Sequence, residues 1–390
     1  MKKKHFYQLA LFFVLGLPFL VIGGGIVGFV VYDPLQLFHK PYFRADTLHE
    51  DMHVQAPGLI RHSDYNSLFI GSSAFQNVSL AEVDKIFGEK FLNLSLFGSI
   101  YFHRKYLFDF IKKVHSEPIH KVFLTFDFYR GISELKDALK DKEIRHPFLY
   151  DESRINDIKI YFNAHFVKCL ATWSEKPNCI GRAGHRDFVL SPFSEEERLQ
   201  EDMGGVENWP QYFPERRVKV LQKLVRQFDK PYQEGDEVND LYQHQIFEPM
   251  KDHMNRYILQ MARDNPRTEF IMLIQPSSRF LYSALYRNRS YRTSRFRLVR
   301  NLVRASKDIS NFKVYGFEDK EFLDNLSNYL DPTHYIPKVI DDVLMRVSRN
   351  EGLITVQNLE DYIQIALDKA ENYDSSLDLE SIRKTFPSIQ

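Results

Sequence analysis

The longest uncharged stretch of the chain lies near its N-terminus. Lysines at positions 2–4 precede 23 residues, Leu9 to Val31, that carry no charged side chain. At about 1.5 Å per residue such a helix would cover about 34 Å, against roughly 30 Å for a bilayer's hydrocarbon core. The pattern therefore predicts one transmembrane helix, and the lysines predict a cytoplasmic N-terminus. A cleaved signal peptide is the alternative, but its apolar region is usually shorter and no A-x-A site precedes Tyr32.

Short apolar runs alternate with helical periodicity in the rest of the chain. The expected strands are Ser67–Gly71, Phe91–Gly98, His120–Phe128, Thr268–Pro276 and Asn311–Phe317. Helices are expected after Ser79, where a capping box with Glu82 begins one, and over Tyr101–Val114 and Tyr291–Ser306. This alternation indicates an α/β fold with three layers: a mostly parallel sheet with helices on both faces, preceded by the transmembrane helix.

Two regions depart from the alternation. Residues 32–66 contain scattered prolines and charges and predict an irregular connector, whereas about 131–248 is polar and aromatic and predicts a large insertion. Within the insertion, helices are expected at Ser153–Val167 and Glu215–Phe228, and a last helix at Val356–Asn372. Residues 1–45 should then hold the cytoplasmic tip, the anchor and the start of the connector, and 46–390 one extracytoplasmic domain.

Candidate chemistry stands where the expected strands end, because reactive groups of open α/β sheets lie at the carboxyl ends of strands. Ser73 is in a turn of small residues after the first strand, and Gly98 follows the second. Asp331 and His334 follow the last strand in the sequence DPTH. They have the residue types of a nucleophile, a backbone oxyanion donor, and a base with its orienting carboxylate. Taken singly, the serine turn is also typical of a helix cap and DPTH of an ordinary turn.

These residues resemble the motifs of the SGNH, or GDSL-type, hydrolase superfamily. Gly71-Ser72-Ser73 matches its G-D-S turn with serine in place of aspartate, Gly98 matches its second block, and Asp331 with His334 matches its D-x-x-H. The resemblance covers roughly residues 67–100 and 268–345. In the third block Asp127 stands near the position of the family's asparagine, and a carboxylate cannot donate to an oxyanion. Asn77 or a backbone N–H is then the expected substitute.

The resemblance implies a serine-dependent acyltransferase or esterase, of an SGNH-like or flavodoxin-like fold, that uses an acyl-Ser73 intermediate. A membrane-anchored, extracytoplasmic member looks most like the D-alanyl transfer and alginate O-acetylation proteins. We therefore expect an envelope polysaccharide or lipid-linked substrate, the lipid bilayer and an envelope glycan or acyl-donor protein as partners, and no cofactor or metal. The alternatives are a catalytically degenerate domain that binds polymer or scaffolds an assembly, and a tethered interaction protein with a structural DPTH turn.

Composition and charge add few constraints. Lys plus Arg and Asp plus Glu are equal at 52 each, which gives no support to nucleic-acid binding. Cys169 and Cys179 are the only cysteines, and their expected compartment allows either a local disulfide or two unpaired thiols. Eight arginines between Arg279 and Arg304 suit an anionic polymer or headgroup surface, or alternatively pair with acidic segments elsewhere.

Overall fold

The computed structural model describes residues 12–49, 51–96, 98–128, 144–183, 203–212 and 215–389. The chain divides into two compact units. The first comprises residues 1–63, 110–115 and 143–185, and the second comprises 64–109, 116–142 and 186–390. The expected insertion at 131–248 thus contributes to both units, and its residues 131–143, 184–202 and 213–214 lie outside the described part of the chain.

A six-stranded, mostly parallel sheet forms the centre of the second unit. Its strands are β2 (Ser67–Ile70), β3 (Phe91–Asn93), β4 (Lys121–Phe126), β6 (Glu269–Ile274), β7 (Phe312–Tyr315) and β8 (Leu353–Ile354). They lie in the order β3-β2-β4-β6-β7-β8, and only β8 is antiparallel. The five parallel strands therefore have the order 2-1-3-4-5 of the flavodoxin-like folds, with the switch point between β2 and β4. The α/β prediction is confirmed.

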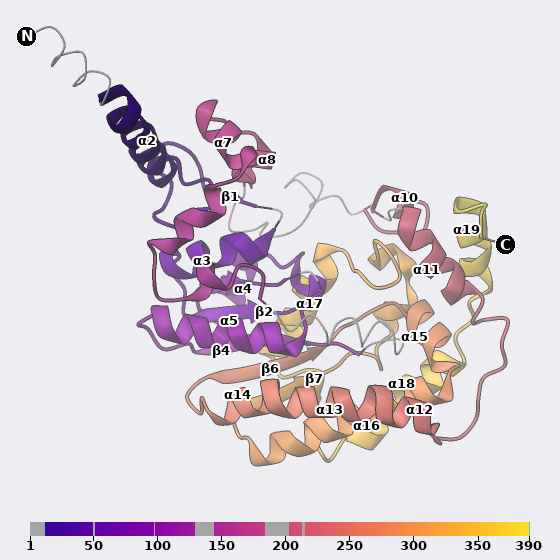
Figure 1. Ribbon diagram of the computed structural model, residues 1–390. Coiled ribbons are helices and arrows are strands. Elements are labelled where there is room, and N and C mark those ends of the chain that lie inside the picture. Colours follow the sequence, from indigo (N-terminus) through magenta and orange to yellow (C-terminus); the bar gives the residue numbers. More distant parts are fainter. Residues whose placement is uncertain are drawn as a thin grey trace, which may run out of the picture. The chain divides into compact units, whose positions relative to one another are not determined.

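Helices cover both faces of this sheet. Figure 1 shows α4 (Leu80–Phe87) and α17 (Pro337–Ser348) on one face, and α13 (Glu248–Met254), α14 (Gln260–Arg263) and α16 (Arg289–Asp308) on the other. The other helices of this unit are α10 (Trp209–Tyr212), α11 (Glu215–Val225), α12 (Asp240–Tyr242), α15 (Arg279–Tyr286), α18 (Leu359–Glu371) and α19 (Ser376–Thr385). Helix α5 (Tyr101–Val114) has residues in both units. Shorter turns are η2 (Ser73–Phe75), η5 (Gln243–Phe247), η6 (Asn255–Leu259), η7 (Glu321–Asp324) and η8 (Leu326–Asn328).

Phenylalanines fill the space under the candidate serine turn. Phe69 of β2 stacks on Phe123 of β4 with ring centroids 4.7 Å apart, and it meets Phe75 edge-on at 5.0 Å. All three side chains are fully buried. Such pairs add to the free energy gained by burying the rings, so the segment that carries Ser73 rests on a rigid base.

The first unit is built around the end of an apolar helix. Its elements are η1 (Phe12–Gly16), α2 (Leu17–Tyr32), β1 (Thr47–Leu48), α3 (Met52–His62), η3 (Pro147–Tyr150), η4 (Asn156–Tyr161), α7 (Ala164–Ala171), α8 (Pro177–Ile180) and β5 (Arg182–Ala183). Strands β1 and β5 pair in antiparallel fashion. Buried Asp33 ends α2 and accepts hydrogen bonds from the Tyr161 hydroxyl and three backbone N–H groups, although burial raises its pKa.

The expected transmembrane helix over Leu9–Val31 is not supported by the helices of the structure. Across the described residues, none combines the length and apolar character that a membrane span requires. Helix α2 has 16 residues, a rise of about 24 Å, and a separate π-helical turn precedes it. Residues 9–11 of the expected segment lie outside the described part.

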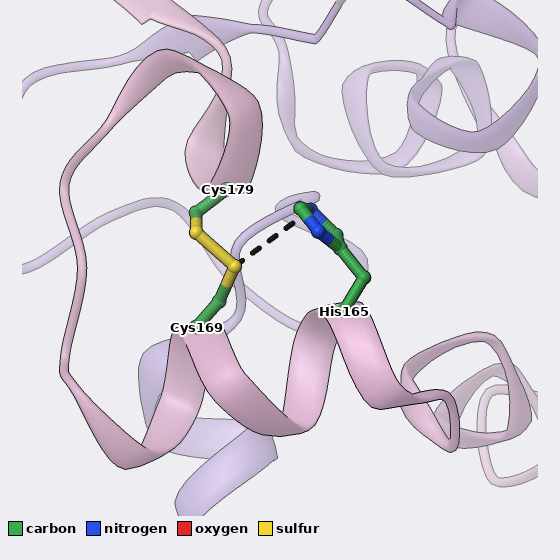
Figure 2. Close-up of side chains that lie close together, drawn as sticks. All are labelled: His165, Cys169 and Cys179. Atoms are coloured by element: carbon green, nitrogen blue, oxygen red, sulfur yellow. Dashed lines mark hydrogen bonds between the residues drawn. A yellow bond between two sulfur atoms is a disulfide. The ribbon is translucent and has the colours of Figure 1, made fainter.

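The cysteine pair forms a disulfide. Cys169 on α7 and Cys179 on α8 are bonded, with Cα atoms 5.7 Å apart, as Figure 2 shows. The adjacent His165 donates its Nε2–H to the carbonyl of Asn178 at 2.6 Å, and the same nitrogen lies 3.7 Å from the Cys169 sulfur. The bridge therefore joins two short helices, and the alternative of two unpaired thiols is wrong.

Several local predictions also need correction. The connector is not irregular throughout, because α3 forms at Met52–His62 with Asp51 as its N-cap. Strand β3 ends at Asn93 instead of Gly98, since the Asn93 side chain binds the backbone of Ser95 and of Phe75 and turns the chain out of the sheet. The helix expected at Ser153–Val167 is instead the 3-10 turn η4 followed by α7.

Candidate functional site

The serine turn begins where β2 leaves the sheet. Gly71 is required there by close packing, because a Cβ atom would lie 2.6 Å from the Phe75 ring and 2.9 Å from the Thr125 methyl. The Ser72 N–H donates to the Thr125 hydroxyl at 3.1 Å, and η2 then starts at Ser73. The turn thus holds the half-buried Ser73 at the carboxyl end of β2, beside the switch point.

Ser73, His334 and Asp331 form one hydrogen-bonded chain. The Ser73 hydroxyl is 2.8 Å from His334 Nε2, and His334 Nδ1 is 2.6 Å from Asp331 Oδ2. An aspartate at Nδ1 leaves Nε2 as the acceptor that faces the serine hydroxyl, which is the arrangement needed for proton removal from Ser73. The structure therefore brings together three side chains that are up to 261 positions apart in the sequence.

Asp331 is a buried carboxylate held in its ionised form. Burial raises its pKa, but the neighbouring His334 charge and hydrogen bonds from His334 and the Thr333 N–H outweigh burial, and the pKa falls to about 2. Its Oδ1 accepts from the backbone N–H groups of Thr333 and His334 at 2.7 and 2.9 Å. A carboxylate fixed in this way orients the imidazole ring and stabilises its positive charge.

Hydrogen bonds join the DPTH loop to the serine turn. The Tyr335 hydroxyl donates to the Ala74 carbonyl at 2.6 Å, and the Asn77 amide donates to the Tyr335 carbonyl at 2.9 Å. Ser278, at the start of α15, donates its hydroxyl to the Pro332 carbonyl at 2.7 Å. Asn77 is therefore a supporting residue, since this bond directs its amide to the backbone next to His334.

Asp127 belongs to a polar network behind the serine turn. Its Oδ1 accepts from the Ser72 hydroxyl at 2.9 Å and the Gln275 amide at 2.8 Å. Its Oδ2 pairs with buried Arg104 and accepts from the Thr125 hydroxyl at 3.0 Å. Four donors saturate an ionised carboxylate, which has no proton to give. Asp127 thus occupies the end of the third parallel strand as a structural anion and supplies no oxyanion donor.

Gly98 lies in a loop fastened to the serine turn. The Leu96 N–H and the Ser99 hydroxyl both donate to the carbonyl of Gly71 at 2.9 Å, on either side of Gly98 in the chain. Gly98 is exposed, with φ of +64°, a conformation that favours glycine. These bonds hold the Gly98 loop to the backbone that leads into the serine turn.

The insertion contributes contacts that the sequence did not predict. Trp209, fully buried, donates its indole N–H to the Tyr329 carbonyl at 2.9 Å, and Gly205 N–H donates to the same oxygen at 3.1 Å. Arg217 of α11 lies 3.3 Å from Asp331 Oδ2. The one sequence signal was the presence of a tryptophan in a polar stretch. Residues of the insertion thus hold the segment before Asp331 and add a positive charge next to it.

Most arginines of the expected anionic-binding segment have partners within the fold. Arg279, Arg292 and Arg295 are buried; Arg295 pairs with Glu318, and Arg279 lies 2.8 Å from Asp324. Arg300 binds exposed Glu360. These contacts favour the interpretation in which the arginines pair with acidic groups. Their spacing reflects the packing of α15 and α16 more than a surface for polymer.

Among the described residues, the contacts of His103 do not extend the site. His103 is buried in α5, and its Nδ1 faces the Ile100 N–H at 3.4 Å, whereas His185 lies outside the described residues. Among the described residues, His165, Cys169 and Cys179 form the one group close enough to share a metal ion, but a disulfide consumes both sulfurs. A bonded sulfur pair is not a thiolate ligand set.

Comparison with known proteins adds no relative: no family model, no curated protein and no solved structure matches this chain. The interpretation of the site therefore rests on its residues and their geometry.

Proposed function

We propose that this chain is a serine-dependent acyltransferase or esterase that acts on a cell-envelope polysaccharide or a lipid-linked substrate. The observation that carries the proposal is the hydrogen-bonded chain from Ser73 through His334 to Asp331, with distances of 2.8 and 2.6 Å. A serine is a weak nucleophile at neutral pH unless an adjacent base accepts its proton, and this geometry supplies that base.

The proposed reaction has two halves. The Ser73 oxygen attacks the acyl carbonyl carbon while His334 Nε2 takes its proton, and His334 then returns the proton to the departing oxygen. An acyl-Ser73 ester remains. In the second half the oxygen of a hydroxyl group, of water or of a polymer, attacks the acyl carbon while His334 Nε2 takes its proton, and His334 then returns that proton to the departing Ser73 oxygen. Asp331 stabilises the imidazolium in both halves.

Backbone N–H groups are proposed to stabilise the oxyanion, because Asp127 cannot. The Gly98 N–H is the expected donor, since its loop is bound to the Gly71 carbonyl next to the serine turn. The resemblance to SGNH hydrolases supports this role, and so does the 2-1-3-4-5 strand order.

We also propose that Leu9–Val31 anchors the chain in a membrane, with the N-terminus cytoplasmic and the residues after Val31 on the other side. The run without charges supports this, and so do the side chains of α2, which are exposed and apolar from Leu17 to Ile22. The Cys169–Cys179 disulfide supports an extracytoplasmic location, because disulfides persist outside the reducing cytosol.

A catalytically degenerate domain that binds polymer or scaffolds an envelope complex is the second candidate. The saturated Asp127 favours it, because the site lacks the side-chain oxyanion donor that the related motif supplies. Under this alternative Ser73 would not react with acyl-type probes.

A serine-reactive fluorophosphonate separates the two candidates. We expect the full-length chain to be labelled, the Ser73→Ala variant to lose labelling, and Ser348→Ala to keep it, since Ser348 is an exposed helix residue that bonds Met345. Circular dichroism checks that Ser73→Ala folds. Absence of labelling in the wild type favours the degenerate candidate, and undiminished labelling of Ser73→Ala contradicts the proposed nucleophile.

A further inference from the structure

The first unit exposes large aromatic side chains around the end of α2. Tyr42, Phe43, Phe162 and Trp173 are exposed by 71, 66, 56 and 45%. We call these four residues the aromatic collar. Aromatic side chains usually bury most of their area, so four that remain exposed in one unit indicate a contact with something else.

Every member of the collar is tied to the last turn of α2. Trp173 packs on Tyr32 with ring centroids 5.2 Å apart, and Phe43 packs on Trp173 at 6.3 Å. Phe162 meets Phe29 at 6.1 Å. The collar therefore surrounds the point at which the apolar helix enters the folded unit.

Tyr42 reaches the same turn through a histidine. It stacks on His39 at 4.3 Å, and His39 Nε2 lies 2.7 Å from the Val30 carbonyl. This bond uses a backbone acceptor of the helix end, so the loop that carries Tyr42 and Phe43 is held to α2.

Trp173 has a backbone conformation that favours glycine. Its φ is +45°, in the left-handed region that bulky residues rarely adopt, and its N–H donates to the Leu170 carbonyl at 3.0 Å. Glycine would relieve this strain, but it would remove the exposed ring. A strained residue with an exposed ring is a sign of function at that position.

We infer that the aromatic collar lies in the headgroup layer of a lipid bilayer and fixes the depth of the first unit on it. This inference rests on the proposed anchoring by Leu9–Val31. Tryptophan and tyrosine favour the membrane–water interface because their rings are apolar and their N–H or O–H groups remain hydrated.

The side chains of α2 identify lipid as the occupant. Phe19, Leu20 and Val21 are consecutive, and they are exposed by 74, 62 and 66%. Three successive helical positions point in different directions, so the helix is apolar on every side. A protein partner would have to surround the helix, whereas acyl chains do so without specific contacts. The collar then stands where the acyl region would end.

Exposed lysines beside the collar fit lipid phosphates. Lys40 is two residues before Tyr42, and Lys176 is three residues after Trp173. Positive side chains near a membrane surface are attracted to anionic headgroups. The collar should therefore bind more strongly to vesicles that contain anionic lipid than to neutral vesicles.

Tryptophan fluorescence provides the test, because the chain has two tryptophans and Trp209 is fully buried. The full-length protein is reconstituted into phosphatidylcholine vesicles, with or without phosphatidylglycerol. Some vesicles contain lipids brominated near the headgroup end of the acyl chain, and others contain lipids brominated near the methyl end. The difference between the wild type and Trp173→Phe isolates the Trp173 signal, so no change at Trp209 is needed.

We expect lipids brominated near the headgroup to quench most of the Trp173 emission, and those brominated at the methyl end to quench much less. Phe43→Ser should reduce this quenching, whereas Leu377→Ser, which removes an apolar side chain exposed by 77% in the other unit, should not. Equal loss in both variants contradicts a specific collar.

The remaining outcomes separate the collar from the anchor. If the protein enters the vesicles but Trp173 is not quenched, or is quenched more strongly by lipids brominated at the methyl end, the inference about the collar is wrong and the proposed anchor stands. Protein that stays out of vesicles overturns both. Trp173 emission that responds to protein concentration without lipid identifies self-association and overturns the lipid assignment. Labelling of Ser73 is independent of all these outcomes.

Discussion

Arg217 places a guanidinium nitrogen 3.3 Å from Asp331 Oδ2, the same oxygen that binds the His334 ring. The arginine comes from the insertion and the carboxylate from the DPTH loop. The Asp331 carboxylate therefore shares this oxygen between the His334 ring and a second, positively charged side chain. The insertion therefore influences the proton acceptor of the proposed site without touching Ser73.

Replacing Arg217 tests this influence. In Arg217→Gln the Asp331 carboxylate loses one of the two side chains that bind its Oδ2, so it should hold the His334 ring less firmly. We expect the rate of fluorophosphonate labelling at Ser73 to fall about two-fold, since partly exposed charge pairs have modest effects. Arg217→Lys, which keeps the positive charge, should label at the wild-type rate. An equal loss in both variants would contradict a role for the charge.

The pKa of Asp331 predicts how it contributes to stability. Its carboxyl has a pKa of about 2 in the folded chain, against 3.8 for an unperturbed aspartate. A lowered pKa stabilises the folded state above about pH 4, and this contribution disappears as the pH falls towards 2. It amounts to about 2 kcal/mol.

Urea unfolding of Asp331→Asn as a function of pH checks this contribution. The difference from the wild type should be about 2 kcal/mol near neutral pH and should shrink as the pH falls below 4. A difference that stays constant down to pH 2 would show that lost packing, rather than ionisation, accounts for it.

The variant Asp127→Asn tests whether Asp127 acts as a structural anion or whether a side chain at this position can stabilise the oxyanion. The amide keeps the size of the side chain but leaves the buried Arg104 charge unpaired, so we expect a loss of about 3 kcal/mol in the free energy of unfolding. Asp109→Asn is the matched control: its partner Lys105 is partly exposed, and the change should stay within about 0.5 kcal/mol. Faster labelling of Ser73 in Asp127→Asn would instead mean that an amide there serves the oxyanion.

The disulfide should stabilise the first unit measurably. Cross-linking two residues ten positions apart restricts the unfolded chain and contributes about 2.5 kcal/mol. Thermal unfolding of the double variant Cys169→Ser with Cys179→Ser should show this loss, and a reductant should lower the melting temperature of the wild type but not of the variant. Identical melting of the oxidised wild type and the variant would contradict the prediction.

The hydrophobic pattern by itself determined the parallel sheet and the position of the candidate serine. Short apolar runs that end in glycine or serine predict buried strands followed by turns, because both depend mainly on residues that are close together in the sequence. The same pattern correctly placed Ser73 in the turn after β2, whereas β3 ends at Asn93, before Gly98, and β7 ends at Tyr315, well before Asp331. It could not show that Ser73 and His334 are within 2.8 Å, because that contact depends on how β2 and the DPTH loop pack.

Only the tertiary structure decided which charges neutralise one another. Asp127 meets Arg104, and Arg295 meets Glu318, across distances in sequence that carry no periodic signal. The hydrogen bond from Trp209 to the Tyr329 carbonyl likewise joins residues that are far apart in the sequence. A charged or aromatic residue looks alike in the sequence whether it faces solvent or a buried partner, so the role of each depends on contacts that form when distant segments pack.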